Sequence, residues 1–122
     1  MEDHYILIVD DDPIVSRALQ QTLTAAGHRA MVTNDRATGL ATALDSLPRL
    51  LLLDIELPDG TGWDLLADLR EARPNEKIPV IVVSANRITR AQLREQRVER
   101  LVSKPFDMRY LVETVQKTIA PA

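Results

Sequence analysis

The fold of this chain is decided by Tyr5-Ile6-Leu7-Ile8-Val9-Asp10-Asp11-Asp12 and by a second stretch, Leu50-Leu51-Leu52-Leu53-Asp54. Each stretch is a short apolar run that ends directly in aspartate. Short continuous apolar runs are typical of strands that are buried on both faces of a parallel sheet. The carboxyl ends of such strands meet at one edge, where open α/β sheets bind ligands. We therefore expect the acids of both stretches to lie together.

Strand and helix patterns alternate five times along the chain. The expected strands are residues 5–9, 29–33, 50–54, 78–83 and 100–103. The expected helices are residues 13–26, 35–46, 63–72, 86–97 and 108–119. This alternation predicts an α/β fold, a doubly wound parallel sheet of five strands with five helices on both faces. The strand at 29–33 is the least apolar, so we expect it at an edge.

Local signals support the helix positions. Asp12 is expected to cap the first helix, Pro13 suits its first position, and Asp107 is expected to cap the last helix. The apolar face of the first helix is predicted at helical spacing to contain Ile14, Val15, Ala18, Leu19, Thr22 and Leu23. The fourth helix has no apolar stripe, so its packing should be loose.

Length and composition predict one soluble domain over residues 1–122. With 45% hydrophobic and 27% charged residues the chain has an ordinary globular composition, and its net charge of −3 gives no argument for nucleic-acid binding. The chain has no cysteine, which excludes disulfides and thiolate chemistry. The acidic start, Met1-Glu2-Asp3-His4, is unlike a signal peptide, and no apolar stretch could span a bilayer. We therefore expect a cytoplasmic chain without membrane contact.

The clustered acids indicate a metal site. Asp12 is explained as a helix cap, but Asp10 and Asp11 would only repel each other and Asp54 unless a cation compensated them. Carboxylates and carbonyls suit Mg²⁺. A carboxylate held on a strand end beside Mg²⁺ can also act as a nucleophile toward phosphorus.

Phosphoryl transfer also needs a cation and a hydroxyl near the entering phosphoryl oxygens. The strand at 78–83 is followed by Ser84, and the strand at 100–103 is followed by Lys104. Alone, such a serine is usually a cap and such a lysine is usually solvated. At consecutive strand ends around an acidic pocket, the two supply the donors that the chemistry needs.

The whole chain resembles the CheY-like receiver domain of two-component response regulators. The resemblance is carried by Ile8-Val9-Asp10-Asp11-Asp12-Pro13, by Leu53-Asp54-Ile55-Glu56-Leu57-Pro58-Asp59-Gly60 with Gly62, by Val83-Ser84-Ala85 and by Ser103-Lys104-Pro105-Phe106. It implies a flavodoxin-like strand order, 2-1-3-4-5. It also implies that the chain is a signalling phosphoacceptor and not an enzyme on other substrates, catalysing only its own phosphorylation and dephosphorylation.

The resemblance implies a role for each site residue. Asp54 would accept a phosphoryl group from a phosphohistidine on a sensor histidine kinase or phosphotransfer domain. Asp11 would ligate Mg²⁺ directly, Asp10 largely through water, and Glu56 through its backbone carbonyl. Lys104 would pair with a phosphoryl oxygen, with a cis bond to the proline that follows it.

The resemblance also implies a switch that controls an output or a partner. Ser84 would turn its hydroxyl to the phosphoryl group and pull its loop inward. The chain departs from the family at Leu101, where an aromatic switch residue is common, and at Arg97-Val98, which replace a usual Gly-Ala step. The atypical fourth helix is a third departure.

Four arginines, Arg87, Arg90, Arg94 and Arg97, recur at helical spacing in the fourth helix. They could form a solvated face or a contact surface for an acidic partner. The favoured partner is a second copy, giving a homodimer through the fourth and last helices. Direct DNA binding is disfavoured because this helix has few polar base-reading side chains.

Three functions other than that of a receiver are alternatives for the same residues. Leu53-Asp54-Ile55-Glu56 faintly resembles the strand end of haloacid-dehalogenase-type phosphatases, which would make the chain a small Mg²⁺-dependent phosphohydrolase. Turnover of a small phosphoester would favour that reading. A binding module that is never phosphorylated conflicts with the intact acidic, serine and lysine set. A nucleotide-binding domain is disfavoured because the four glycines form no phosphate-cradling loop.

Overall fold

The computed structural model describes residues 4–119, so the acidic start at 1–3 and the last three residues lie outside the described part. Five strands form one parallel sheet: β1 (Tyr5–Val9), β2 (Arg29–Thr33), β3 (Leu50–Asp54), β6 (Val80–Ser84) and β7 (Arg100–Ser103). Their order is β2-β1-β3-β6-β7, which confirms the predicted 2-1-3-4-5 topology and the edge position of β2. A small antiparallel hairpin, β4 (Glu56–Leu57) with β5 (Gly60–Thr61), was not predicted.

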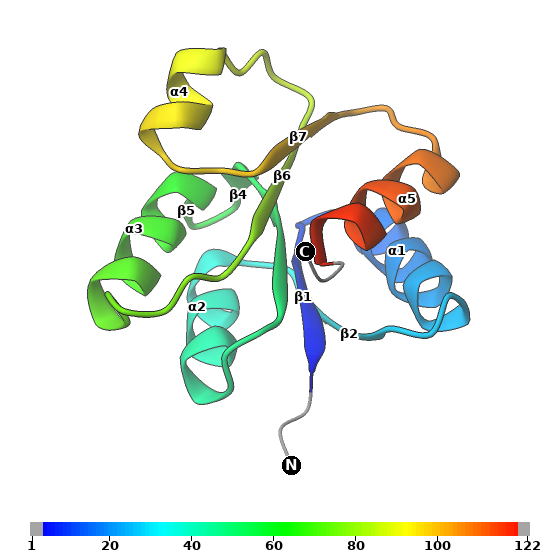
Figure 1. Cartoon of the computed structure of the whole chain (residues 1–122), viewed down its shortest axis with the longest axis horizontal. Helices are drawn as coiled ribbons and strands as arrows, with labels where there is room; N and C mark the ends of the chain where they lie inside the picture. Colours follow the sequence, from blue (N-terminus) through cyan, green and yellow to red (C-terminus); the bar gives the residue numbers. More distant parts are fainter. Residues whose placement is uncertain (1–3, 120–122) are drawn as a thin grey trace.

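Helices cover both faces of the sheet (Figure 1). They are α1 (Pro13–Ala25), α2 (Arg36–Asp45), α3 (Gly62–Ala72), α4 (Arg90–Glu95) and α5 (Met108–Ile119). In Figure 1, α2, α3 and α4 lie on one side of the sheet, and α1 and α5 lie on the other. Among residues 4–119, no helix has the length and apolar character needed to cross a bilayer.

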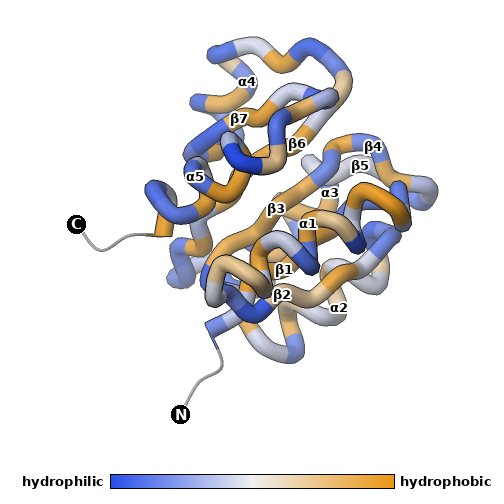
Figure 2. The backbone as a smooth tube through the Cα atoms, turned by 90° about the vertical axis from the view of Figure 1, so that its right-hand side faces the viewer, coloured by the Kyte–Doolittle hydropathy of each residue, from blue (hydrophilic) through white to orange (hydrophobic). Residues whose placement is uncertain are grey.

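Alternate residues of the central strands point into two separate cores. Leu7 of β1 and Leu53 of β3 pack on the side of α2 and α3, whereas Ile8 and Leu52 pack on the side of α1 and α5. Both strands are buried along their whole length. Figure 2 shows the hydrophobic colour running along β3 through the middle of the molecule. Because both faces of these strands are buried, their sequences are continuous apolar runs and do not alternate between apolar and polar residues.

The helix caps follow the sequence signals. The Asp12 carboxylate accepts hydrogen bonds from the backbone N–H groups of Ile14 and Val15, and Pro13 takes the first helical position of α1. Asp107 likewise accepts a hydrogen bond from the N–H of Arg109 at the start of α5. These bonds satisfy N–H groups that have no partner inside the helix.

The fourth helix differs most from its prediction. It covers Arg90–Glu95 and not residues 86–97, because Thr89 caps it in a reciprocal arrangement with Gln92. Arg97, with a φ of 52°, is already in the left-handed region where a helix ends. No residue of α4 is buried, which confirms its expected loose packing.

Two smaller predictions were also wrong. The strand β6 begins at Val80, two residues later than expected, and includes Ser84. Ile14 does not belong to the apolar face of α1, since 80% of its surface is exposed. It lies on the exposed side of the first turn, whereas Ser16 in the same turn and Leu19 and Leu23 further along are buried.

Candidate functional site

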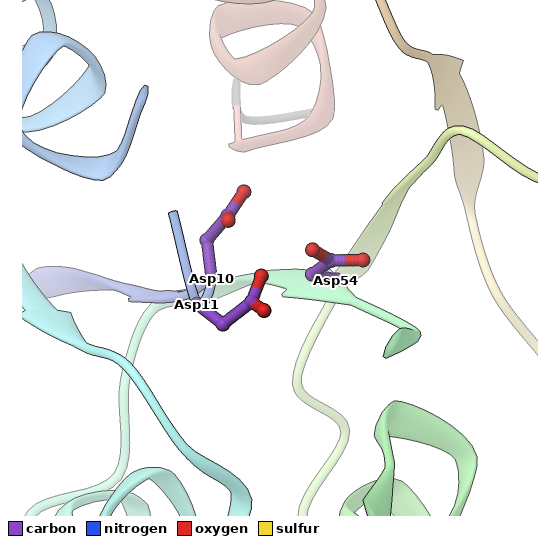
Figure 3. A group of neighbouring side chains, drawn as sticks. All are labelled: Asp10, Asp11 and Asp54. Carbon is purple, nitrogen blue, oxygen red and sulfur yellow. The ribbon is translucent and has the colours of Figure 1, made fainter. Parts of the chain in front are cut away.

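Three carboxylates meet where β1 and β3 end (Figure 3). One oxygen from each of Asp10, Asp11 and Asp54 can be chosen so that all three lie within 4.8 Å of one another. Asp10 and Asp54 are 2% and 5% exposed, whereas Asp11 is exposed to solvent. Oxygens bound at about 2.1 Å to one Mg²⁺ lie within about 4.2 Å of each other, so the group needs only a small inward shift to hold that ion. The predicted assembly of the three acids is confirmed.

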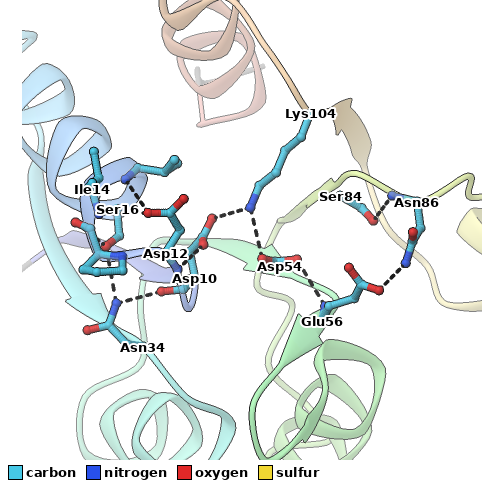
Figure 4. Close-up of polar contacts among 12 residues, drawn as sticks. Asp10, Asp12, Ile14, Ser16, Asn34, Asp54, Glu56, Ser84, Asn86 and Lys104 are labelled. Atoms are coloured by element: carbon cyan, nitrogen blue, oxygen red, sulfur yellow. Dashed lines mark hydrogen bonds and ion pairs between the residues drawn. The ribbon is translucent and has the colours of Figure 1, made fainter.

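Lys104 joins the two buried acids from the end of β7 (Figure 4). Its Nζ atom lies 3.0 Å from an oxygen of Asp10 and 3.1 Å from an oxygen of Asp54. Partial burial acts to lower the pKa of Lys104, but the bonds from the two carboxylates outweigh it and hold that pKa above its ordinary value. The lysine therefore stays charged and neutralises part of the acidic group. Its bond to Pro105 is cis, as expected.

The electrostatics of Asp54 are dominated by its burial. Desolvation raises the pKa of this carboxyl, while hydrogen bonds from Lys104 and from the backbone N–H of Glu56 act against the rise. The nearby Asp10 charge adds a further small rise. A carboxylate that carries this desolvation cost is stabilised by any additional cation placed beside it.

Ser84 lies next to this group at the end of β6 and is 1% exposed. Its hydroxyl oxygen accepts a hydrogen bond of 3.0 Å from the backbone N–H of Asn86. Its own backbone carbonyl accepts a hydrogen bond from the N–H of Lys104, which fixes these two strand ends side by side. The hydroxyl proton remains available for an acceptor in the pocket.

Glu56 contributes a contact that the sequence did not indicate. Its carboxylate accepts a hydrogen bond of 2.5 Å from the side-chain amide of Asn86, across the mouth of the site (Figure 4). This bond links the loop after Asp54 to the loop after β6. The sequence carried no signal for the pair, because the two residues lie 30 positions apart and belong to different loops.

The loop after Asp54 is held at two further points. The Asp59 carboxylate accepts hydrogen bonds from the backbone N–H groups of Arg36 and Ala37, at 2.7 and 3.0 Å, at the start of α2. At the other end of the loop, Gly62 begins α3 so close to β3 that an added Cβ atom would lie 2.5 Å from the carbonyl oxygen of Asp54. The loop therefore has little freedom to shift.

Asn34 is a second residue that the sequence did not single out. Its side-chain amide donates to the carbonyl oxygen of Asp10, at 2.7 Å, and to the hydroxyl of Ser16. It thus ties the end of β1 to the end of β2 (Figure 4).

The arginine face does not form as predicted. Only Arg90 and Arg94 lie on α4, whereas Arg87 precedes the helix and Arg97 follows it. All four are exposed. Leu101, the expected switch position, is half-buried against the core on the α2 and α3 side, and its role stays a prediction.

Comparison with known proteins agrees with this geometry. The model of the response regulator receiver domain family matches residues 6–116. The chain is 36% identical over 117 residues to the TorCAD operon transcriptional regulatory protein TorR of Escherichia coli O157:H7, covering 95% of the chain and 50% of TorR. It is 30% identical over 114 residues to the DNA-binding transcriptional regulator NtrC of Azospirillum brasilense, covering 93% of the chain and 24% of NtrC. The chain thus spans about a quarter to a half of the length of these relatives.

Solved structures show the same likeness. A CheY-like response regulator receiver domain protein from Methanospirillum hungatei superposes with a TM-score of 0.86 at 27% identity, covering 95% of this chain and 93% of that one. The response regulator TrrA from Thermotoga maritima, solved in complex with Mg²⁺ and BeF, gives a TM-score of 0.81 at 25% identity, covering 94% of this chain and 98% of that one. With the family model matched over nearly the whole sequence, this chain belongs to the response regulator receiver domains.

Proposed function

We propose that Asp54 accepts a phosphoryl group from a phosphohistidine on a sensor kinase or phosphotransfer domain. One observation carries this proposal: a buried carboxylate at a strand end shares its surroundings with two more acids and a lysine. A carboxylate oxygen of Asp54 would form the new bond to phosphorus as the bond from phosphorus to the histidine nitrogen breaks. Hydrolysis of the acyl phosphate in the same pocket would reset the domain.

The residues around Asp54 suit a Mg²⁺ ion, which when bound would offset the charge that gathers on the transferred group. Asp10 already uses one oxygen for the N–H of Asp12 and the other for Lys104, so it is suited to contact through water. Asp11 is exposed and suited to direct ligation. The backbone carbonyl of Glu56 is the expected fourth protein group.

Lys104 and Ser84 would receive the phosphoryl oxygens. Lys104 already bridges Asp10 and Asp54, so its ammonium group lies where negative charge would enter. The Ser84 hydroxyl would exchange its acceptor role toward Asn86 for a donor role toward a phosphoryl oxygen. That exchange would draw the loop after β6 inward and change α4, which is how the switch would start.

The phosphorylation signal would leave the domain through a contact surface formed by α4 and α5. Arg90 and Arg94 are exposed on α4, and Tyr110 on α5 is 54% exposed, so these helices offer charged and aromatic groups to a second copy. We place this homodimer in the cytoplasm. We also take residues 1–122 as one receiver domain whose switch acts on an attached output domain or a separate partner.

Treatment with acetyl phosphate and Mg²⁺ tests the proposal. Intact mass should rise by one phosphoryl group, peptide mapping should place it on Asp54, and fluorescence of the half-buried Trp63 should change. Asp54→Asn should abolish both signals, and the matched surface variant Glu71→Gln should keep them. A phosphoryl group on another residue would contradict the assignment. Steady release of phosphate from small phosphoesters would instead favour a phosphohydrolase.

A further inference from the structure

A cavity of about 570 Å³ lies at the end of the sheet opposite Asp54. It is bounded by the last turn of α3, the loop that follows α3, and the connection from α4 to β7. Ile78, just before β6, forms part of its apolar wall with Leu66 and Leu69 of α3. The volume falls in the range of small-molecule sites, and the cavity shares no lining residue with the acidic site.

The charged lining of this cavity is predominantly positive. Four cationic residues face two carboxylates: Arg70, Arg73, Lys77 and Arg97 against Glu76 and Glu99. Among residues 4–119, the side chains of Lys77 and Arg97 have no hydrogen bond or ion pair. One carboxylate oxygen of Glu99 already accepts a hydrogen bond from the backbone N–H of Val80, so this carboxylate offsets the cations less fully. The cavity therefore keeps an uncompensated positive charge.

Arg70 reaches across the cavity from α3 to the end of α4. Its guanidinium donates to the backbone carbonyls of Gln96 and Arg97. Burial lowers the pKa of Arg70 and the neighbouring Arg97 charge lowers it further, while the Glu99 carboxylate offsets only part of this effect. An anion between these two arginines would remove that repulsion and strengthen the link between α3 and α4.

The backbone of Arg97 points to a role for its side chain. Its φ of 52° lies in the left-handed region, which glycine adopts at the end of a helix without steric cost. The hydrogen bond from the N–H of Val98 to the carbonyl of Leu93 closes the helix around it. This backbone conformation disfavours an arginine, yet the residue at this position is an arginine that lines the cavity. Residues held in a strained conformation are often found at functional sites.

We propose that this cavity binds a small organic anion that carries phosphate or carboxylate groups. The forked donors of Arg97 would grip the anionic oxygens, with Lys77 as a second point charge. The apolar part of the ligand would lie on Leu66, Leu69 and Ile78. Because Arg70 contacts the last carbonyls of α4, the bound anion would also hold the end of that helix in place.

Calorimetric titration of the chain with two probes tests this proposal. ATP represents a phosphate-bearing anion and citrate a carboxylate-bearing one, both with EDTA present and in about 150 mM salt, where long-range attraction is screened. At least one probe should bind, and the preferred probe identifies the anionic group. Amide NMR shifts should concentrate in residues 69–78 and 96–99.

Arg97→Gly and Arg97→Asn are the decisive variants, because both residues accept the left-handed backbone and should fold as the parent does. Each should weaken binding roughly tenfold, as expected for the loss of charge-assisted hydrogen bonds. Arg17→Gln removes the same charge from α1, outside the cavity, and should change affinity by no more than roughly twofold. Three results would overturn the proposal: neither probe binds, both Arg97 variants bind like the parent, or Arg17→Gln weakens binding as strongly.

Discussion

The side-chain amide of Asn86 donates a hydrogen bond to the carboxylate of Glu56 and so joins the loop after Asp54 to the loop before α4. The second loop leads into a helix with no buried residue, so this bond helps to restrain the loop and the start of the helix. A change at Asp54 that moves Glu56 would therefore be passed to the segment that begins at Asn86.

The first prediction concerns this link. Asn86→Ala should free the loop before α4 at a cost of only about 0.5–1.5 kcal/mol, the usual net value of one hydrogen bond. Hydrogen exchange should accelerate across residues 85–95, while the strands keep their protection. The control Asn75→Ala changes an exposed residue in the loop after α3. Equal exchange in the Asn86 variant and the parent would show that the bond does not restrain α4.

The second prediction concerns Lys104. Lys104→Met should lower the free energy of unfolding by about 1–3 kcal/mol, because Asp10 and Asp54 are left buried without their cation. The lower part of that range is expected because Lys104 is partly exposed. Millimolar Mg²⁺ should restore much of the loss by binding to the folded state, and Asp11→Asn should weaken this rescue.

The pH dependence of this effect has a definite sign. The pKa of Lys104 is raised above its ordinary value of 10.5. Its stabilisation is therefore complete below pH 10.5 and is lost as the pH rises through the higher folded value. Denaturant melts should show the parent and Lys104→Met converging only in strong alkali. Convergence near neutral pH would contradict a charged lysine in the pocket.

The third prediction concerns Asp59. Hydrogen bonds from the backbone N–H groups of Arg36 and Ala37 lower its pKa below the ordinary 3.8. Its stabilising effect should be complete above pH 3.8 and should fade as the pH falls through the lower folded value. Asp59→Asn should therefore melt below the parent at neutral pH and approach it in acid. Glu113→Gln, an exposed change on α5, should show no such convergence.

The fourth prediction concerns the homodimer. Arg90→Glu and Arg94→Glu should each reduce phosphorylation-dependent dimerisation in light scattering, because both reverse an exposed charge on α4. Phosphorylation of Asp54 by acetyl phosphate should keep its rate. Arg17→Glu makes the same charge change on α1, on the other side of the sheet, and should dimerise like the parent. If the α4 variants also dimerise normally, the two arginines form only a solvated surface.

The strands and the acidic group could be predicted because each depends on a local pattern. The runs before Asp10 and Asp54 are long enough to indicate strands, and parallel topology then brings their ends together. Lys104 and Ser84 followed from the same rule. Each of these positions is set by where a strand stops, which a single sequence shows well.

The errors arose where tertiary structure decides. The end of α4 depends on the left-handed backbone of Arg97, which arginine rarely adopts, so helical spacing extended the prediction too far. Ile14 has the right spacing for a core residue but lies on the exposed side of the helix. The contacts made by Asn86 and Asp59 join distant segments and leave no mark in either segment alone.

The close approach of Gly62 to the carbonyl of Asp54 bears on how sequence variation in this chain is interpreted. Gly62 carries no reactive group, yet any larger residue there must displace the strand end that carries Asp54. In a saturation mutagenesis screen scored by signalling, position 62 should rank with the acids. When the same variants are scored by protein abundance, Gly62→Ala should lower abundance because its Cβ atom strains the backbone. Asp54→Asn adds no such strain and should leave abundance close to that of the parent.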